Sequence, residues 1–388
     1  MDTQTVVDNI REIAAEFAKE RGERQLRRDL RRADLDKIKD SGYLLTAVPV
    51  DQGGIFEGVE KSTRPICDML RVLAQGDPSI ALVSAMHPAV ITFGGWLLLP
   101  EAPPPYRDAW EEQRRWVFQT AVDGCQWGTI VSEPGSGGDT GKTIAVAKLT
   151  GREGEYLLSG EKHFGSGSGM TSFMVTTAIP EGESEIESFF MDMRGVPWDG
   201  SAGVKLAAEW DGWGMTATQS HALTFQDFPV TRSAWPGIRQ QPQLAGGSAG
   251  CMFTAVIVGV IEVAIDTARR RLYGKKDWTR SYEQTEWAQI EIESWLIHQA
   301  YEGMLRSVET GEGGTQDTLL GKEAVAQLAE TVMLRICKVM GGGSYSRRSP
   351  FGYWLQDVRA LGFLRPPWAL AFDQIFQGAM ADDGTVEG

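Results

Sequence analysis

Three Gly- and Ser-rich segments contain the residue types that could do chemistry. They are WGTIVSEPGSGGD at 127–139, SGEKHFGSGSG at 159–169 and DGWGMTATQSHALTF at 211–225. Turns of this composition expose backbone N–H groups and short hydroxyl side chains, which suit a flat ring with polar edges and a phosphate tail. A fourth segment, MGGGSY at 340–345, follows a long helical stretch and by itself is typical of a helix C-cap.

The sequence does not support three other kinds of site, namely a phosphate loop, a nucleophile elbow and a metal site. GSGGDTGKT at 135–143 departs from the phosphate loop because Ser136 stands where glycine is required, and a strand-like TIAVAKL follows in place of a helix. GSGSG at 165–169 leads into another strand-like stretch, so it is no nucleophile elbow. The histidines lack metal-ligand spacing, and no metal is expected. His87, in ALVSAMHPAV, is retained as a candidate residue of a substrate pocket.

Composition narrows the class of protein. Of 388 residues, 42% are hydrophobic and 23% charged, and the net charge of −14 argues against a nucleic-acid partner. The four cysteines form no CxxC pair, which predicts a reducing, cytoplasmic location. The apolar stretch at 251–265 is interrupted by Glu262 and is shorter than the ~20 residues of a membrane span, so a buried core helix and no membrane partner are expected. An arginine-rich run at 21–32 is predicted to be a solvated helix face.

Hydrophobic periodicity divides the chain into three domains. A helical period covers 1–116, strand-like alternation covers 117–236, and a helical period returns over 237–388. The strands expected in the central domain are TIAVAKL and EYLLSGEK around a GREG turn, then FMVTTAI, SFFMDM and HALTFQDF. Long helices are expected at 250–273, 282–308 and 319–340. Strands flanked by runs of helices predict an α+β fold.

Taken in order and spacing, the segments resemble the motifs of the acyl-CoA dehydrogenase superfamily of FAD enzymes. SEPGSGGD stands where that family has TEPGxGSD, GEKHFGSGS where it has GxKxWITNG, and GWGMTATQSHALTFQDFPV where it has GMRxTxSxxxxFxDVxVP. ARRRLYGKK resembles RxxFGK, and MGGGSYSRRSPFGYWLQDVRA matches FGGxGYxxxxPxxRxxRDA without a gap. The similarity runs from about Ile13 to Ala371.

The resemblance implies an N-terminal α-helical domain, a central β-barrel-like domain and a C-terminal four-helix bundle, assembled as a homotetramer. It also implies FAD between the β domain and the C-terminal helices. The implied contacts are Ile130, Val131 and Ser132 at the flavin pyrimidine edge, Phe164 on the ring, Ser166 at N5, Arg270 on the pyrophosphate, and Gly341, Gly342 and Gly343 near a neighbouring subunit's FAD.

Departures from the family pattern concern its catalytic base. In the family register, the Glu that removes the substrate α-proton falls at Arg365, and the family's alternative Glu falls near Ala249. Arginine stays protonated at neutral pH and cannot act as a base. Arg365 is therefore the candidate catalytic residue, as a clamp for a carboxylate or a stabiliser of an oxyanion. Gly138 replaces a Ser that the family places near the thioester, so it is assigned to the substrate pocket.

These departures predict an FAD-dependent oxygenase that uses reduced flavin and O₂ on a small organic substrate. Ser166-Gly167 matches the SG found in the monooxygenase branch, although the His that this branch often carries near the lost Glu is missing here. No GxGxxG follows a strand, which predicts a separate flavin reductase or electron carrier. Two alternatives stay open: an acyl-CoA thioester dehydrogenase or oxidase with a relocated base, and a catalytically silent flavin-binding scaffold.

Overall fold

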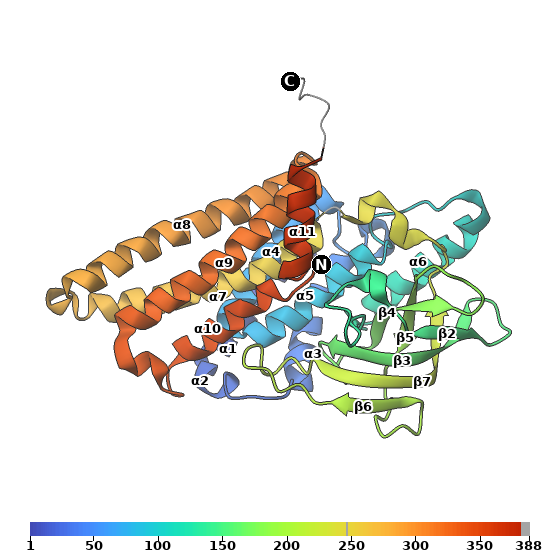
Figure 1. The fold of residues 1–388 in the computed structure, drawn as a ribbon, viewed down its shortest axis with the longest axis horizontal. Coiled ribbons are helices and arrows are strands. Elements are labelled where there is room, and N and C mark those ends of the chain that lie inside the picture. Colours follow the sequence, from blue (N-terminus) through green and yellow to red (C-terminus); the bar gives the residue numbers. More distant parts are fainter. Residues whose placement is uncertain (246, 382–388) are drawn as a thin grey trace.

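The computed structural model describes residues 1–245 and 247–381, in which helices precede and follow a set of strands (Figure 1). The N-terminal domain consists of α1 Thr3–Lys19, α2 Arg21–Arg24, α3 Arg32–Asp40, α4 Val59–Gly76, α5 Pro78–Phe93 and α6 Arg107–Val122. α6 continues past the expected boundary at residue 116, because Val117, Phe118 and Ala121 bury one face of the same helix. The first strand therefore begins only at Trp127.

The central domain is a barrel with two accessory strands. Its strands are β1 Trp127–Thr129, β2 Val146–Leu149, β3 Glu155–Gly165, β4 Phe173–Pro180, β5 Glu187–Asp192, β6 Val204–Ala208 and β7 His221–Arg232. β4, β2, β3, β7 and β5 pair in that order, and β5 pairs with β4 again, which closes the ring. Every strand expected from the sequence is present. β1 and β6 were not expected, because one is three residues long and the other is mostly exposed.

An aromatic cluster attaches β1 to the N-terminal domain. The Trp127 ring stacks on Phe173 of β4 at 4.9 Å and lies 5.3 Å from Trp96, which follows α5. Its indole N–H donates to Thr120 Oγ1 of α6 at 2.9 Å. Aromatic pairs of this kind add to the apolar burial. These contacts fix the position of β1, and therefore the start of the segment that follows it.

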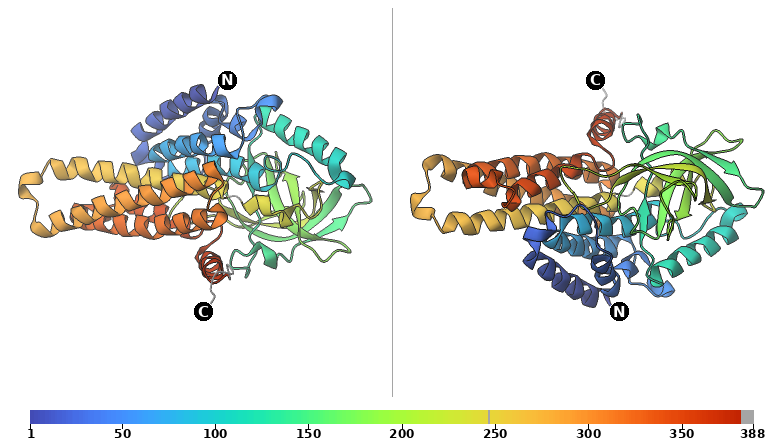
Figure 2. Two further views of the ribbon diagram at one scale, coloured as in Figure 1. Left: turned by 90° about the horizontal axis from the view of Figure 1, so that it is seen from above. Right: turned by 90° about the horizontal axis from the view of Figure 1, so that it is seen from below.

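The C-terminal domain is the helical bundle that the resemblance implied. It contains α7 Ser248–Tyr273, α8 Ser281–Thr310, α9 Gly314–Met340, α10 Pro350–Val358 and α11 Trp368–Ala379. The three long helices run side by side away from the barrel, the N-terminal helices lie on one side of them, and α11 lies on the other (Figure 2). The short α10 packs on α7 and α9 as the fourth helix of the bundle.

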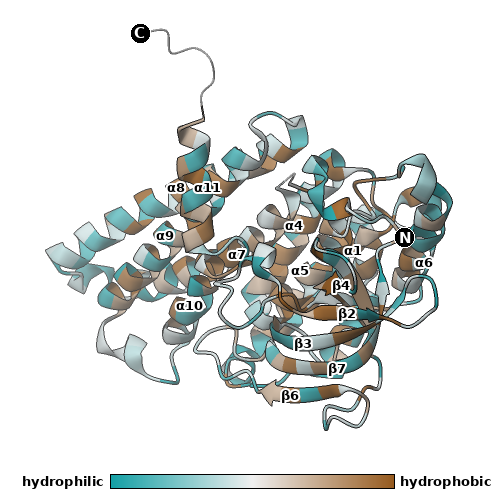
Figure 3. Ribbon diagram, turned by 45° about the vertical axis from the view of Figure 1, so that its right-hand side comes forward, coloured by the Kyte–Doolittle hydropathy of each residue, from teal (hydrophilic) through white to brown (hydrophobic). Residues whose placement is uncertain are grey.

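α7 is the central core helix. It is long and apolar enough to cross a membrane, the one such helix in the described part of the chain, yet 83% of its most apolar window is buried inside the protein. Figure 3 shows that apolar residues dominate α7, whereas α8 is largely polar. The prediction of a buried core helix is confirmed. The expected span of 250–273 differs from α7 only at its first two residues. Glu262 lies within the helix, where its carboxylate accepts from Arg71 and Gln75 on α4.

The prediction that the arginine-rich run at 21–32 is solvated is wrong for Arg24, although Arg28, Arg31 and Arg32 are exposed. Arg24, in the run expected to be a solvated helix face, is 5% exposed. Its guanidinium binds Asp34 at 2.8 Å and Asp77 at 2.9 Å. A buried guanidinium needs such partners, and Asp77 comes from a distant part of the sequence.

Candidate functional site

A buried ion pair supports the site from within the barrel. Residues of β3 alternate between the barrel interior and the surface, and this period of two carries Lys162 inward, where its side chain is 0% exposed. Lys162 Nζ donates to Glu133 Oε1 and, at 2.6 Å, to the carbonyl oxygen of Thr177. Burial lowers the pKa of Lys162 to about 8, against the opposing effect of Glu133. Glu133 also accepts the N–H of Ile144 at 2.7 Å, so the segment after β1 is fixed.

Two chain segments meet at the rim above this pair. The N–H of His163 donates to the carbonyl oxygen of Ser132 at 2.8 Å, which joins the segment after β1 to the end of β3. Phe164 follows with φ of +59°, a strained conformation for an aromatic residue, and its side chain is 58% exposed. The rim thus presents an aromatic ring toward the exterior beside the Val131–Ser132 backbone.

A chain of hydroxyl groups orients Ser166. Ser166 Oγ lies 2.8 Å from Ser220 Oγ, which lies 2.7 Å from Thr218 Oγ1. Thr218 donates its only hydroxyl hydrogen to the carbonyl oxygen of Met215 at 2.9 Å. Ser220 therefore donates to Thr218, and Ser166 donates to Ser220. The free lone pairs of Ser166 Oγ are left to accept a hydrogen bond.

Arg365 joins the C-terminal segment to this rim. Its guanidinium donates from Nη1 to the carbonyl oxygen of Gly138 at 2.6 Å and from Nη2 to Ser132 Oγ at 2.7 Å. Burial and, to a smaller extent, Arg239 lower the pKa of Arg365 to about 10, so the group stays charged at neutral pH. The structure therefore brings together Ser132, Gly138 and Arg365, which the sequence analysis had assigned separately to the cofactor contact, the substrate pocket and catalysis.

Gly138 packs against the C-terminal segment. Its φ is +83°, and a Cβ at this position would lie 2.9 Å from Pro367 Cγ. Both features favour glycine. A serine at this position would therefore require the residues that follow Arg365 to shift.

Ile130 was predicted to contact the cofactor, but its backbone groups have partners within the protein. Its N–H donates to Val175 at 2.9 Å, its carbonyl oxygen accepts from Thr176 Oγ1 at 2.6 Å, and its side chain is fully buried in the barrel. Both polar groups are therefore used within the sheet. Val131 and Ser132 are the residues of this segment that reach the rim.

The predicted pyrophosphate contacts lie elsewhere on the same chain. Arg270 is exposed in the last turn of α7, and Gly341, Gly342 and Gly343 follow α9. These helix ends lie at the tip of the bundle, away from the barrel (Figure 1). One copy of the chain does not bring them together with Phe164 and Ser166, so any joint contact requires a second copy.

His87 is a structural residue, which corrects its assignment to a substrate pocket. The side chain is 0% exposed, Nε2 lies 3.0 Å from the carbonyl oxygen of Leu44, and Nδ1 accepts the N–H of Trp127 at 3.1 Å. Both ring nitrogens are thus used in the core. Burial lowers the pKa of His87 to about 4, so the ring is neutral in the folded protein.

Acid is expected to destabilise the protein through this histidine. The unfolded chain binds a proton at His87 below about pH 6.5, whereas the folded chain does so only near pH 4. The contribution of His87 to the free energy of unfolding is therefore fully present above pH 6.5 and is lost as the pH falls toward 4. The expected loss between pH 7 and pH 5 is about 2 kcal/mol. Urea unfolding at both pH values measures this loss. His87→Gln should reduce the loss, whereas His163→Gln should not, because the His163 side chain is 31% exposed. Equal losses in all three proteins would contradict the assignment.

Sequence reasoning missed three residues at or near the site. Arg239, in the η5 turn Ile238–Gln240, donates from Nη2 to Thr140 Oγ1 at 3.0 Å. Asp357 accepts the N–H of Met215 at 2.7 Å, and burial raises its pKa to about 7. Ser220 is the middle member of the hydroxyl chain. Their sequence contexts are ordinary turns or helices, and the only available signal was that Ser220 and Asp357 lie within family-like motifs.

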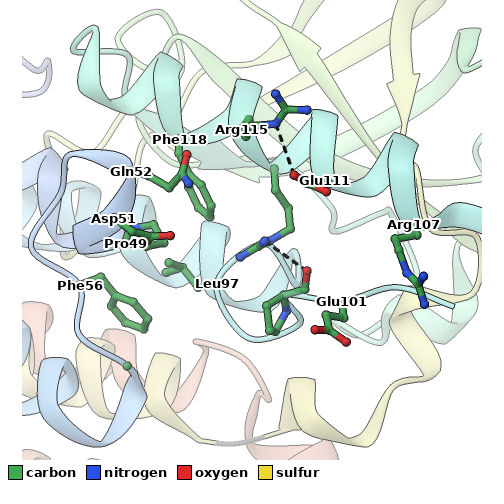
Figure 4. A pocket seen from close by; sticks show the side chains of 13 residues that line it. Pro49, Asp51, Gln52, Phe56, Leu97, Glu101, Arg107, Glu111, Arg115 and Phe118 are labelled. Atoms are coloured by element: carbon green, nitrogen blue, oxygen red, sulfur yellow. Dashed lines mark hydrogen bonds and ion pairs between the residues drawn. The ribbon is translucent and has the colours of Figure 1, made fainter. Parts of the chain in front are cut away.

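A separate cavity of about 810 Å³ lies in the N-terminal domain (Figure 4). It is lined from 49–58, from 97–101 and from α6. Its charges are mixed, with Asp51, Glu101 and Glu111 facing three arginines, and Arg115 lies within 4.0 Å of Glu111. No residue of the rim described above lines this cavity.

Comparison with known proteins defines the class of this chain. Residues 128–228 match the family model for the acyl-CoA dehydrogenase middle domain. Butyryl-CoA dehydrogenase of Megasphaera elsdenii superposes with a TM-score of 0.80 at 16% identity, covering 97% of both chains. The resemblance is confirmed: the chain contains the acyl-CoA dehydrogenase middle domain, it has the acyl-CoA dehydrogenase fold, and its relatives are flavin-dependent oxidoreductases.

Within this class, other relatives include oxygen-transferring enzymes. Amino sugar nitrososynthase DnmZ of Streptomyces peucetius is 25% identical, over 85% of this chain and 82% of its own. "Probable FMNH2-dependent monooxygenase SfnC" of Pseudomonas putida is 27% identical, over 70% of this chain and 63% of its own. The structure of KijD3 with FMN and a dTDP-linked amino sugar has a TM-score of 0.81 at 20% identity, covering 97% of this chain and 93% of that one.

Proposed function

We propose that the protein is a flavin-dependent monooxygenase that receives reduced flavin from a separate reductase and acts on a small organic substrate. The observation that carries the proposal is the guanidinium of Arg365 at the position of the dehydrogenase base, bound to Ser132 and Gly138. Removal of an α-proton requires a base within hydrogen-bond reach, and a guanidinium is no base at neutral pH. Oxygen transfer has no such requirement.

Glu133 cannot take over as the base. Its carboxylate binds Lys162 and also accepts the N–H groups of Ile144 and Ala145, and it is 7% exposed. A proton removed from a substrate would have to reach a group already surrounded by donors. This arrangement supports the oxygenase proposal over the dehydrogenase alternative.

The rim residues fit a flavin ring. When bound, reduced flavin would supply the electrons that activate O₂. Phe164 offers an exposed aromatic face, and Val131 and Ser132 offer backbone groups beside it. Ser166 Oγ is oriented to accept a hydrogen bond, which suits the N–H at N5 of a reduced ring rather than the lone pair of an oxidised ring. Arg365 would stabilise negative charge that develops beside the ring.

The relatives support the oxygenase proposal. SfnC is named for FMNH₂-dependent monooxygenation and DnmZ for nitroso-group synthesis. Butyryl-CoA dehydrogenase shares the fold as well, so thioester oxidation is the alternative to be tested.

The decisive experiment follows flavin absorbance after rapid mixing. The protein is loaded with FMN or FAD, reduced without oxygen, and mixed with oxygenated buffer in the presence of candidate amines, thioethers and aromatics. A lag before oxidised flavin returns, with oxygen from O₂ in a product, is the expected result. Immediate return, together with anaerobic bleaching of the oxidised flavin by acyl-CoA thioesters, would instead establish a dehydrogenase. A protein that binds neither flavin would be a silent scaffold.

The flavin species and the assembly belong to the same proposal. The resemblance favours FAD in a homotetramer, whereas the KijD3 structure holds FMN. Several large apolar side chains of the C-terminal domain are exposed in a single copy, which supports contact with further copies. They are Trp295, Leu334, Phe363, Phe372 and Phe376. We propose a cytoplasmic location, supported by the four cysteines, which are free thiols.

Arg270→Ala is expected to distinguish the two flavins. If FAD is used, its pyrophosphate would meet Arg270 of a second copy, so FAD affinity should fall about tenfold while FMN affinity stays unchanged. Fluorescence titration of the oligomer with each flavin measures both. Arg269→Ala is the matched control, because that exposed neighbour is paired with Asp266 and Glu291. Equal changes for FMN and FAD would exclude a pyrophosphate role.

A further inference from the structure

Two guanidinium groups converge on one short loop of the barrel rim. Arg365 Nη1 donates to the carbonyl oxygen of Gly138 at 2.6 Å, and Arg239 Nη2 donates to Thr140 Oγ1 at 3.0 Å. Arg239 comes from the turn after β7, whereas Arg365 comes from the segment before α11. The fold thus brings two cations from distant parts of the sequence to loop 138–140.

Arg239 has unused binding capacity. Its Nη1 is buried and has no hydrogen-bond partner among the residues that the structure describes. Burial lowers the pKa of Arg239, with an opposing effect from Glu187. A buried N–H donor without a partner is costly, so the group is suited to donate a hydrogen bond to an acceptor atom of a ligand.

Nearby carboxylates do not neutralise the two cations. Glu133 is paired with Lys162. Glu187 is held by Arg232 and by the N–H of Gly237.

Asp139 is the remaining carboxylate close to Arg365, and its Oδ1 accepts the N–H of Gly141. Asp139 thus acts on Arg365, whereas the carboxylate that acts on Arg239, Glu187, is already shared with Arg232. The excess positive charge would favour an oxyanion.

We propose that Arg239 and Arg365 together bind an oxyanion carried by the substrate, such as a carboxylate, sulfinate, sulfonate or phosphate. Paired guanidinium groups recognise such oxyanions through parallel N–H donors. The contact of Arg365 with Ser132 would place the anion beside the rim, so the rest of the substrate would reach the flavin ring. The identification of the anion as substrate rests on the proposed monooxygenase function, whereas the anion site itself rests on the contacts of the two arginines.

Sulfate binding tests the site directly. Isothermal titration of the full chain with sodium sulfate, at ionic strength held constant with sodium chloride, gives the affinity. Arg239→Gln and Arg365→Gln are each expected to weaken sulfate binding at least about tenfold. Arg152→Gln is the control, because the Arg152 side chain is 80% exposed and distant in sequence from both arginines. Unchanged affinity in both site variants, or equal loss in the control, would overturn the proposal.

Two further experiments test whether the anion belongs to the substrate or to the flavin, and whether the variants are correctly folded. Protein loaded with FMN should bind sulfate as tightly as protein loaded with riboflavin; loss with FMN alone would mean that the flavin phosphate occupies the site and would overturn the assignment to substrate. Arg239→Lys keeps the charge and should retain part of the affinity, provided its urea midpoint matches the parent. Sulfate binding without any reaction of reduced flavin would refute the proposed function and leave the anion site standing.

Discussion

Arg365→Ala is expected to leave flavin bound and to lower substrate turnover by about 10²–10³-fold, the effect of removing one preorganised donor to a developing negative charge. The guanidinium is fixed by Ser132 Oγ and the carbonyl oxygen of Gly138, and burial strengthens its interactions in the site. The measurement is steady-state turnover with the substrate found by rapid mixing, together with a flavin titration.

Arg365→Lys separates charge from geometry. A single ammonium group keeps the charge but does not match the planar fork that reaches both oxygen atoms, so turnover between that of the parent and the alanine variant is expected. Arg359→Ala is the matched control, because Arg359 lies in the same C-terminal region, is 46% exposed and contacts Glu330 at 3.8 Å. If Arg365→Ala keeps the turnover of the parent but lowers the free energy of unfolding, the role of Arg365 is only to hold the C-terminal segment against the barrel.

Glu133→Gln is expected to lower the free energy of unfolding by about 3–5 kcal/mol, because it removes the carboxylate partner of Lys162 inside the barrel. The side chains of Glu133 and Lys162 are 3% and 0% exposed. Glutamine also replaces one of the two carboxylate oxygens, of which Oε2 accepts from Ile144 and Oε1 from Ala145. Urea unfolding followed by tryptophan fluorescence measures the change.

The exposed pair Arg152–Glu155 provides the control for Glu133. Glu155→Gln should cost less than about 1 kcal/mol, since solvent screens an exposed pair. Glu133→Leu combined with Lys162→Met should cost less than Glu133→Gln alone, because no buried charge remains. A double variant as unstable as the single one would show that shape, rather than unpaired charge, sets the loss.

Much of this architecture could be predicted from the sequence, because periodicity records which face of an element is buried. The strands β2, β3, β4, β5 and β7 and the helices α7, α8 and α9 all lie where their patterns placed them. The boundary at residue 116 was placed too early because Val117 and Phe118 suit either a strand or a buried helix face. The turns at the rim were found because glycine and serine recur at family-like spacing.

Polar residues whose partners are remote could not be placed from the sequence. Arg24 depends on Asp77, and His87 depends on Leu44 and Trp127; nothing local to either residue signals the partner. Arg239 lies in an ordinary turn, and only the tertiary fold places it at the loop that also contacts Arg365. A polar side chain can be buried only where a partner forms a hydrogen bond or an ion pair with it. That partner can come from any part of the sequence.

The bonds from Arg365 have a consequence for the order in which the protein is made. They connect residues 227 and 233 positions apart, so the barrel leaves the ribosome long before its last partner. Domains generally fold as they emerge, N-terminal parts first. The barrel can therefore form around Glu133 and Lys162 early, whereas the rim acquires its cation only after Arg365, 227 positions beyond Gly138, has been made. A nascent chain that has formed the barrel is thus a folded but incomplete enzyme, and loss of the C-terminal segment would disable the site while sparing the scaffold.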